Sequence, residues 1–100
     1  MVIVGGTFEV EPGQREQFLA SRLEMTRVSR GEAGCLEYTF APDPIDPGRV
    51  VLFERWESQE ALDAHLAALR AGPPSDGSEI EPIWSSVIIY EVSGERQLGH

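Results

Sequence analysis

The sequence predicts one α+β domain in which two helices cover one face of a four-stranded antiparallel sheet. Strand-like and helix-like patterns follow one another in the order βαββαβ, which builds such a sheet. A chain of 100 residues with 41% hydrophobic content can bury one modest core but not two. We therefore expect residues 1–93 to form a single domain and residues 94–100 to form a tail.

The second face of the predicted sheet is expected to lie against another copy of the chain. Two helices cannot cover both faces of a sheet, and the third and fourth strands carry apolar residues on both sides. An uncovered apolar face favours association with a partner. A homodimer is the simplest assembly that buries it.

The first half of the chain reads as strand, helix and turn. Val2 to about Val10 is rich in β-branched and aromatic residues, and the pair Gly5-Gly6 suggests a bend or bulge within this strand. From Gln14 to about Arg30, apolar residues recur at spacings of three and four, which predicts one helix with a broad apolar face. Gly34 then suits a left-handed turn or a close backbone approach.

Two strands and a stiff loop are expected next. Cys35 to Phe40 alternates, with Leu36, Tyr38 and Phe40 predicted to share a face. A loop containing Pro42, Pro44 and Pro47 separates this strand from the next. The strand from Arg49 to about Glu57 should place four residues on one side, namely Val50, Leu52, Glu54 and Trp56.

The last part of the domain is predicted to contain a capped helix and a final strand. Ser58 is a good N-cap, and His65 lies on an apolar stripe of the helix, together with Leu62, Leu66 and Leu69. Gly72 and the two prolines after it end this helix. We expect a polar loop over Ser75–Ser78, a short helical turn over Glu79–Trp84 and a strand over Ser86–Val92.

Composition excludes several functional classes. The formal net charge of −9 and a pI near 4.5 argue against nucleic acid or an anionic membrane surface as a partner. The chain contains neither lysine nor asparagine, which excludes Schiff-base lysine chemistry and Walker-type phosphate binding. Its single cysteine, Cys35, suits a reducing compartment, and no apolar run resembles a signal peptide or a membrane span. These observations favour the cytoplasm.

Several motifs, in matching order and spacing from Val2 to about Arg70, resemble the antibiotic biosynthesis monooxygenase family. The matching segments are Val10–Gly13 with Phe18, Ser29–Tyr38, Asp43–Pro47, Phe53–Ser58 and Ala61–Leu66. This resemblance implies a ferredoxin-like fold that forms a dimeric α+β barrel. It also implies cofactor-independent oxidation by O₂ of a phenolic, anthrone or hydroquinone-type molecule held between the sheet and the helices. Such electron-rich substrates can reduce oxygen once deprotonated, so we expect neither a cofactor nor a metal.

The resemblance also suggests which residues form the site. Trp56 matches the family's tryptophan at the end of the third strand, and His65 matches the histidine of its Ala-His-Leu helix motif. We take these two as candidate catalytic residues. The residues expected to bind the small aromatic substrate are Tyr38, Trp84, Thr7, Arg22 and Met25. Haem degradation ranks third, because haem-degrading relatives use an asparagine on the first strand, in the region that Thr7 occupies here.

Each candidate also has a purely structural interpretation. His65 is either a base or a buried histidine bonded to a strand carboxylate such as Glu54. Glu9, Glu37 and Glu54 are either bases with raised pKa values or partners of arginines, and the ion pairs are the favoured interpretation. Cys35 is expected to be a small apolar filler. The alternative function is therefore a non-catalytic dimer of the same fold that binds a small molecule or serves a structural role.

Overall fold

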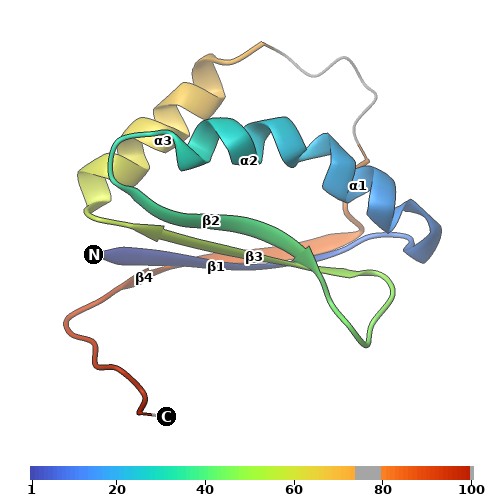
Figure 1. Ribbon diagram of the computed structural model, residues 1–100. Helices are drawn as coiled ribbons and strands as arrows, with labels where there is room; N and C mark the ends of the chain where they lie inside the picture. The colour runs from blue at the N-terminus through green and yellow to red at the C-terminus, as the bar shows by residue number, and fades with distance from the viewer. Residues whose placement is uncertain (74–79, 100) are drawn as a thin grey trace.

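Four antiparallel strands form one sheet, in the order β2-β3-β1-β4 (Figure 1). The computed structural model describes residues 1–73 and 80–99. Its elements are β1 (Val2–Glu9), a 3₁₀ turn η1 (Pro12–Gln14), α1 (Arg15–Ser21), α2 (Leu23–Arg30), β2 (Cys35–Pro42), β3 (Arg49–Trp56), α3 (Gln59–Ala71) and β4 (Trp84–Glu91). The predicted ferredoxin-like α+β class is confirmed, and the sheet of the single chain is not closed into a barrel.

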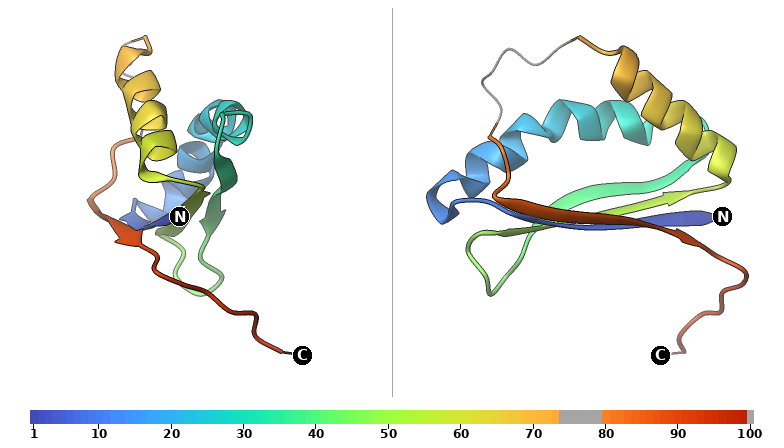
Figure 2. Two further views of the ribbon diagram at one scale, coloured as in Figure 1. Left: turned by 90° about the vertical axis from the view of Figure 1, so that its left-hand side faces the viewer. Right: turned by 180° about the vertical axis from the view of Figure 1, so that it is seen from behind.

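All helices lie on the same face of the sheet, and the two views of Figure 2 show no helix on the other face. Helix α2 runs above β2, while α3 follows directly from the end of β3. Within the described ranges, no helix has both the length and the apolar character needed to cross a membrane. The helices and the sheet therefore form two layers, with the core between them.

The single helix predicted from Gln14 to Arg30 is broken in the structure. Arg22 has φ −95° and ψ −4°, and it separates α1 from α2. The hydroxyl of Ser21 donates a hydrogen bond of 2.6 Å to the carbonyl of Phe18, which competes with the regular helical pattern. The periodicity of apolar residues continues across the break, so the sequence pattern alone did not reveal it.

The irregularity expected in the first strand lies in another strand. β1 pairs with β3 and with β4 without any shift through Gly5 and Gly6, so the predicted bulge is absent there. A Cβ at Gly5 would lie 3.2 Å from the ring of Tyr90, which explains the need for a small residue. The shift occurs between Cys35 and Glu37 of β2. The shift turns Leu36 outward. The prediction that Leu36 shares the buried face of Tyr38 is therefore wrong.

Gly34 and Ser58 adopt the local structures that the sequence predicts, a left-handed turn and a helix N-cap. Gly34 has φ +83°, and a Cβ there would lie 2.5 Å from Cβ of Ala61 in the first turn of α3. The Ser58 hydroxyl accepts a hydrogen bond of 3.1 Å from the Ala61 amide and caps α3. The turn before β2 therefore packs directly on the start of α3.

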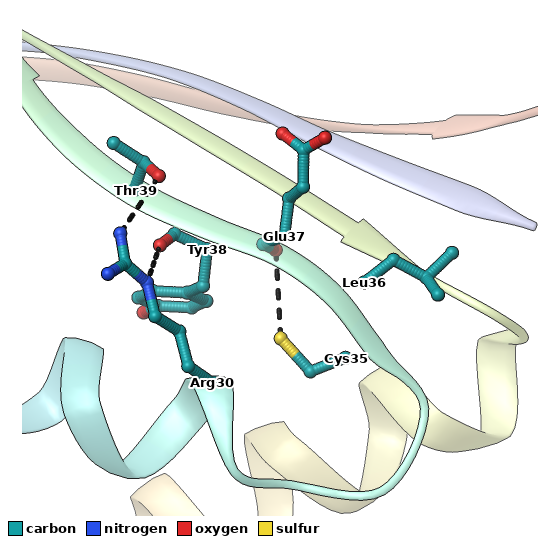
Figure 3. A pocket seen from close by; sticks show the side chains of 6 residues that line it. All are labelled: Arg30, Cys35, Leu36, Glu37, Tyr38 and Thr39. Atoms are coloured by element: carbon teal, nitrogen blue, oxygen red, sulfur yellow. Dashed lines mark hydrogen bonds between the residues drawn. The ribbon is translucent and has the colours of Figure 1, made fainter.

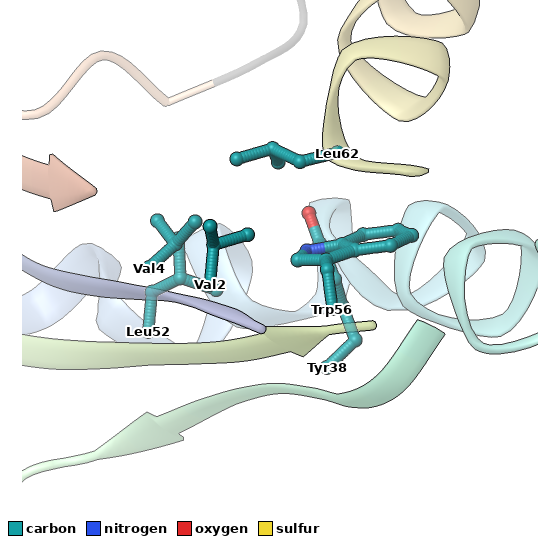
Figure 4. Packing of buried hydrophobic residues seen from close by; sticks show 6 residues of the cluster. All are labelled: Val2, Val4, Tyr38, Leu52, Trp56 and Leu62. Atoms are coloured by element: carbon teal, nitrogen blue, oxygen red, sulfur yellow. The ribbon is translucent and has the colours of Figure 1, made fainter. Parts of the chain in front are cut away.

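The core lies between the helices and the even-numbered residues of β1 and β3. Figure 4 shows its main cluster, which consists of Val2, Val4, Tyr38, Leu52, Trp56 and Leu62. A second cluster surrounds Phe18, which is fully buried against Val10 and Val50 at the other end of the sheet. Val50, Leu52, Glu54 and Trp56 thus share the covered side of β3, as predicted.

The final strand begins earlier than the sequence suggested. β4 starts at Trp84, and residues 80–83 contain no helical turn, so the described part of the turn predicted over Glu79–Trp84 is wrong. The polar loop expected over Ser75–Ser78 lies outside the described residues, and so does Glu79. Residues 94–99 are exposed and belong to no helix or strand. The proposed division at residue 93 stays a prediction.

Candidate functional site

Trp56 lies at the end of β3, where the alternation of the strand turns its side chain toward the helices. Its side chain is fully buried, and the indole Nε1–H donates a hydrogen bond of 2.9 Å to Oε1 of Glu54. Two residues apart on a strand, the two side chains share one face, which is why they meet. Tyr38 on β2 contacts the indole edge-on, with ring centroids 6.5 Å apart. An aromatic wall with one buried carboxylate results.

His65 approaches this wall from α3. Its ring lies 4.7 Å from the Trp56 ring and 5.4 Å from the Tyr38 ring, and only 2% of the residue is exposed. Nδ1 lies 2.6 Å from Oε1 of Glu32, which follows the end of α2. Nε2 lies 4.0 Å from Oε1 of Glu54. His65 is therefore held between two carboxylates that come from different elements.

Burial sets the protonation behaviour of the groups around the histidine. It raises the pKa of the Glu54 carboxyl above its usual value, an effect that the Trp56 hydrogen bond and His65 oppose. Burial, together with the charge of Glu54, also raises the pKa of the Tyr38 phenol. The Tyr38 hydroxyl lies 3.3 Å from Sδ of Met25. The phenol therefore stays neutral, and the cluster can hold a proton on Glu54 more readily than an exposed glutamate would.

The side chains of the cluster are buried and their polar atoms are satisfied: Trp56, Tyr38 and His65 are at most 2% exposed. Throughout the described residues, every buried side-chain nitrogen and oxygen has a hydrogen-bond partner. A groove of about 270 Å³ lies beside the cluster between α2 and α3, lined in part by Met25, Ser29 and Glu32. Glu32 thus lies between His65 and the groove and is the carboxylate that connects them.

A second hollow of about 340 Å³ lies along the β2 edge of the sheet (Figure 3). Arg30 crosses it and donates hydrogen bonds of 2.8 Å to the carbonyl of Tyr38 and 3.2 Å to the hydroxyl of Thr39. Cys35 lines the same hollow, and burial raises the pKa of its thiol. These contacts fix an edge strand to α2, which is a structural role.

Three of the predicted substrate-binding residues lie on the helix-covered side of the sheet, and the other two lie on the opposite side. Tyr38 and Met25 contact each other within the cluster. Arg22 stands at the junction of α1 and α2, where its guanidinium lies 4.6 Å from the ring centre of Phe18. Thr7 on β1 and Trp84 on β4 both point to the bare face of the sheet, which is the face without helices. Thr7 pairs with Ser86, two residues after Trp84, and residues that pair directly point to the same face. Within one chain, Thr7 and Trp84 therefore do not line a cavity with His65.

The strand carboxylates follow the structural interpretation in two cases of three. Glu9 lies 2.8 Å from Arg49, and Glu37 lies 3.2 Å from Arg55. Glu54 instead accepts the indole hydrogen bond. Glu32 was not among the candidates, because a glutamate in the run Gly31–Gly34 after a predicted helix looks like part of a turn. Only its place within the Ser29–Tyr38 motif marked it.

No group of three or more histidine, cysteine, aspartate or glutamate residues in the described ranges could hold a metal ion. His65, Glu32 and Glu54 are titratable groups beside an aromatic wall. A buried histidine hydrogen-bonded to a carboxylate that faces open space can accept or return a proton.

The chain belongs to the antibiotic biosynthesis monooxygenase family, whose sequence model matches residues 1–70. Proteins of this family are generally monooxygenases that act on small molecules, some of them degrade haem, and dimers are common among them. The predicted membership is thus confirmed. The match covers β1 through most of α3, including Trp56, His65 and Glu32.

Curated relatives match over a shorter stretch. An uncharacterised protein of Synechocystis, sll1783, is 34% identical over 65 residues, which is 65% of this chain but only 44% of that protein. YcnE of Bacillus subtilis, a proposed monooxygenase, is 26% identical over 65 residues, or 65% of this chain and 68% of YcnE. The match thus spans less than half the length of the Synechocystis protein.

Solved structures agree in fold over almost the whole chain. A proposed antibiotic biosynthesis monooxygenase from Deinococcus radiodurans superposes with a TM-score of 0.75 at 23% identity, covering 100% of both chains. Rv0793 from Mycobacterium tuberculosis gives 0.70 at 29% identity, covering 96% of this chain and 98% of Rv0793. The haem degrader MhuD from the same bacterium, with two haems bound in its active site, gives 0.69 at 19% identity, covering 97% of this chain and 100% of MhuD.

Proposed function

We propose that this protein is a cofactor-independent monooxygenase that oxidises a phenolic, anthrone or hydroquinone-type small molecule with O₂. The observation that carries the proposal is the buried His65, held 2.6 Å from Glu32, a carboxylate that lines the groove between α2 and α3. Membership of a family of monooxygenases supports it. A substrate of this class supplies the electrons itself, so the protein need only bind it and take a proton.

In the proposed reaction, the substrate enters the groove and gives its acidic proton to the Glu32–His65 pair. His65 assists through its hydrogen bond to Glu32, and Trp56 and Tyr38 hold the imidazole ring in place. The resulting anion reduces O₂. For a hydroquinone, one oxygen atom replaces a ring hydrogen to give a hydroxyquinone, and the other oxygen atom leaves as water.

Haem chemistry fits these residues poorly. His65 is the only histidine in the described ranges, it is almost fully buried, and both of its ring nitrogens face carboxylates. An imidazole in this position cannot reach the iron of a bound haem without leaving Glu32 and the core. We therefore derive no step through haem, although MhuD shares the fold.

We also propose that the active form is a homodimer, and that its subunits meet through the bare face of the sheet. The exposed apolar residues turned to that face are Val51, Phe53, Trp84, Ile88 and Tyr90. A contiguous apolar surface of this kind favours burial against a copy of itself. In such a dimer, Thr7 and Trp84 would line the interface. We place the protein in the cytoplasm, which the single free cysteine favours.

A second candidate is a non-catalytic dimer that binds a small molecule or is purely structural. The burial of the cluster favours it, because the rings of Trp56 and His65 are almost closed off from solvent and so from a molecule that approaches from outside. Such a protein would keep the fold and lose the reaction.

Oxygen consumption with a panel of hydroquinones and anthrones distinguishes the two candidates. The monooxygenase proposal predicts uptake by the wild type above the rate of the buffer, and a loss of that uptake in His65→Asn. No uptake with any member of the panel would favour the non-catalytic dimer.

A further inference from the structure

The groove between α2 and α3 has a mainly apolar lining. Val28 on α2 is 59% exposed and Leu69 on α3 is 42% exposed, and both line the groove together with Met25 and Ala68. Leaving two large aliphatic side chains in water on facing helices costs free energy that a ligand between them would recover. The lining therefore suits an aromatic or aliphatic body.

The charged groups of the groove are carboxylates, and the hydroxyl of Ser29 is a further polar group of its lining. Glu24 and Glu32 line it, and none of the described lining residues is an arginine or a histidine. Glu32 contacts His65 through Oε1, and Oε2 accepts no hydrogen bond from another of the described residues. A carboxylate offers about four acceptor positions, so Glu32 can receive a hydroxyl hydrogen bond while it keeps His65.

The charge of these carboxylates also determines what the groove rejects. A ligand carboxylate placed a few ångströms from Glu32 would meet repulsion and no compensating cation. The volume of about 270 Å³ is at or below the lower end of the usual range for small-molecule pockets, which is about 300–1,000 Å³. One or two fused rings fit such a space.

We infer that the groove between α2 and α3 selects neutral, hydroxyl-bearing aromatic molecules of one or two rings and excludes their carboxylated analogues, with Glu32 as the hydroxyl acceptor. This inference rests on the proposed function for its role, because it narrows the substrate class of the same site. Its test measures binding alone, so it can fail or succeed whether or not the protein consumes oxygen.

Three matched probes test the selection: 2-naphthol, naphthalene and 6-hydroxy-2-naphthoate. The chain has only two methionines, so ¹³C-methyl labelling gives one signal from Met25 in the groove and one from Met1 outside it. We expect 2-naphthol to shift the Met25 signal and to bind about tenfold more tightly than the carboxylate. Naphthalene should bind more weakly than 2-naphthol, and the Met1 signal should not move.

Glu32→Gln removes the charge but keeps an acceptor for His65. It should bring the affinities of 2-naphthol and 6-hydroxy-2-naphthoate within about threefold of each other. Glu16→Gln, the same change on the exposed surface of α1, should keep the wild-type ratio. Thermal unfolding of Glu32→Gln checks the fold, and Glu24→Gln provides a second groove variant, for which a smaller change in the same direction is expected.

Three results would overturn the inference. The first is equal binding of the naphthol and the carboxylate by the wild type. The second is a selectivity that survives both Glu32→Gln and Glu24→Gln. The third is the absence of any Met25 shift with 2-naphthol at millimolar concentration. Selective binding without oxygen uptake would contradict the monooxygenase proposal and support this inference.

Discussion

Replacing Gly34 by alanine tests how the turn that carries Glu32 is attached to α3. The residue has φ +83°, where an L side chain costs about 1–2 kcal/mol. The new Cβ would also lie 2.5 Å from Cβ of Ala61, more than 1 Å inside normal contact, and relieving such a clash costs about 1–3 kcal/mol. We expect Gly34→Ala to lower the free energy of unfolding by about 2–5 kcal/mol.

A second substitution separates the two contributions. Ala61→Gly removes the clashing methyl group at a helix-propensity cost of about 1 kcal/mol. The double variant Gly34→Ala/Ala61→Gly should therefore be more stable than the sum of the single changes predicts, by about 1–3 kcal/mol, while the cost of the positive φ remains. Urea denaturation, with wild type and both single variants, gives this coupling energy directly.

Gly13→Ala is the matched control, since a Cβ at Gly13 would meet nothing within 4 Å. It should change stability by less than about 1 kcal/mol, in the favourable direction if at all. The account of the turn is refuted if Gly34→Ala costs no more than Gly13→Ala, or if the two single changes at Gly34 and Ala61 add without coupling.

Three further predictions concern protonation and assembly. Because burial raises the folded-state pKa of Glu54, the wild type should lose stability as the pH rises from about 4.3 through that pKa, and Glu54→Gln should lack this loss. The stability of both proteins is measured by urea denaturation from pH 4 to 8, and the same pH dependence in both would contradict the prediction. The raised pKa of Tyr38 predicts that near pH 10 the native protein shows less phenolate absorbance than the urea-unfolded protein, and equal absorbance would argue against a buried phenol. Ile88→Glu, on the bare face of the sheet, should convert a dimer to a monomer in analytical ultracentrifugation, whereas the exposed Glu16→Gln should not; an unchanged dimer would place the interface elsewhere.

The order of elements could be predicted from the sequence because it depends on local periodicity. The N-cap at Ser58, the alternation of β3 and the positive φ of Gly34 are likewise local features, and each was expected. The break at Arg22 was missed because the hydrogen bond from the Ser21 hydroxyl to the Phe18 carbonyl leaves the apolar pattern intact. The sequence pattern was sufficient to predict a feature wherever that feature depends on a single helix, strand or turn.

The site was less predictable because its contacts join distant segments. His65 and Trp56, the two candidate catalytic residues, do lie together, with ring centroids 4.7 Å apart. The main partner of His65 is Glu32, 33 residues earlier in the chain, rather than the strand residue Glu54 that was considered. Trp84 turned out to lie on the opposite face of the sheet, because the register of β4 with β1 fixes its side and one strand's composition does not.

The most direct test of the proposed function is the steady-state rate of oxygen uptake with a hydroquinone of one or two rings. The protein is first treated with a chelator, and the wild type is compared with His65→Asn. The account predicts one O₂ consumed per molecule of product without release of hydrogen peroxide. It also predicts a fall in kcat of about 100-fold in His65→Asn, with KM little changed and the unfolding transition retained. Uptake that matches the rate without protein, or a His65→Asn variant as active as the wild type, would contradict it.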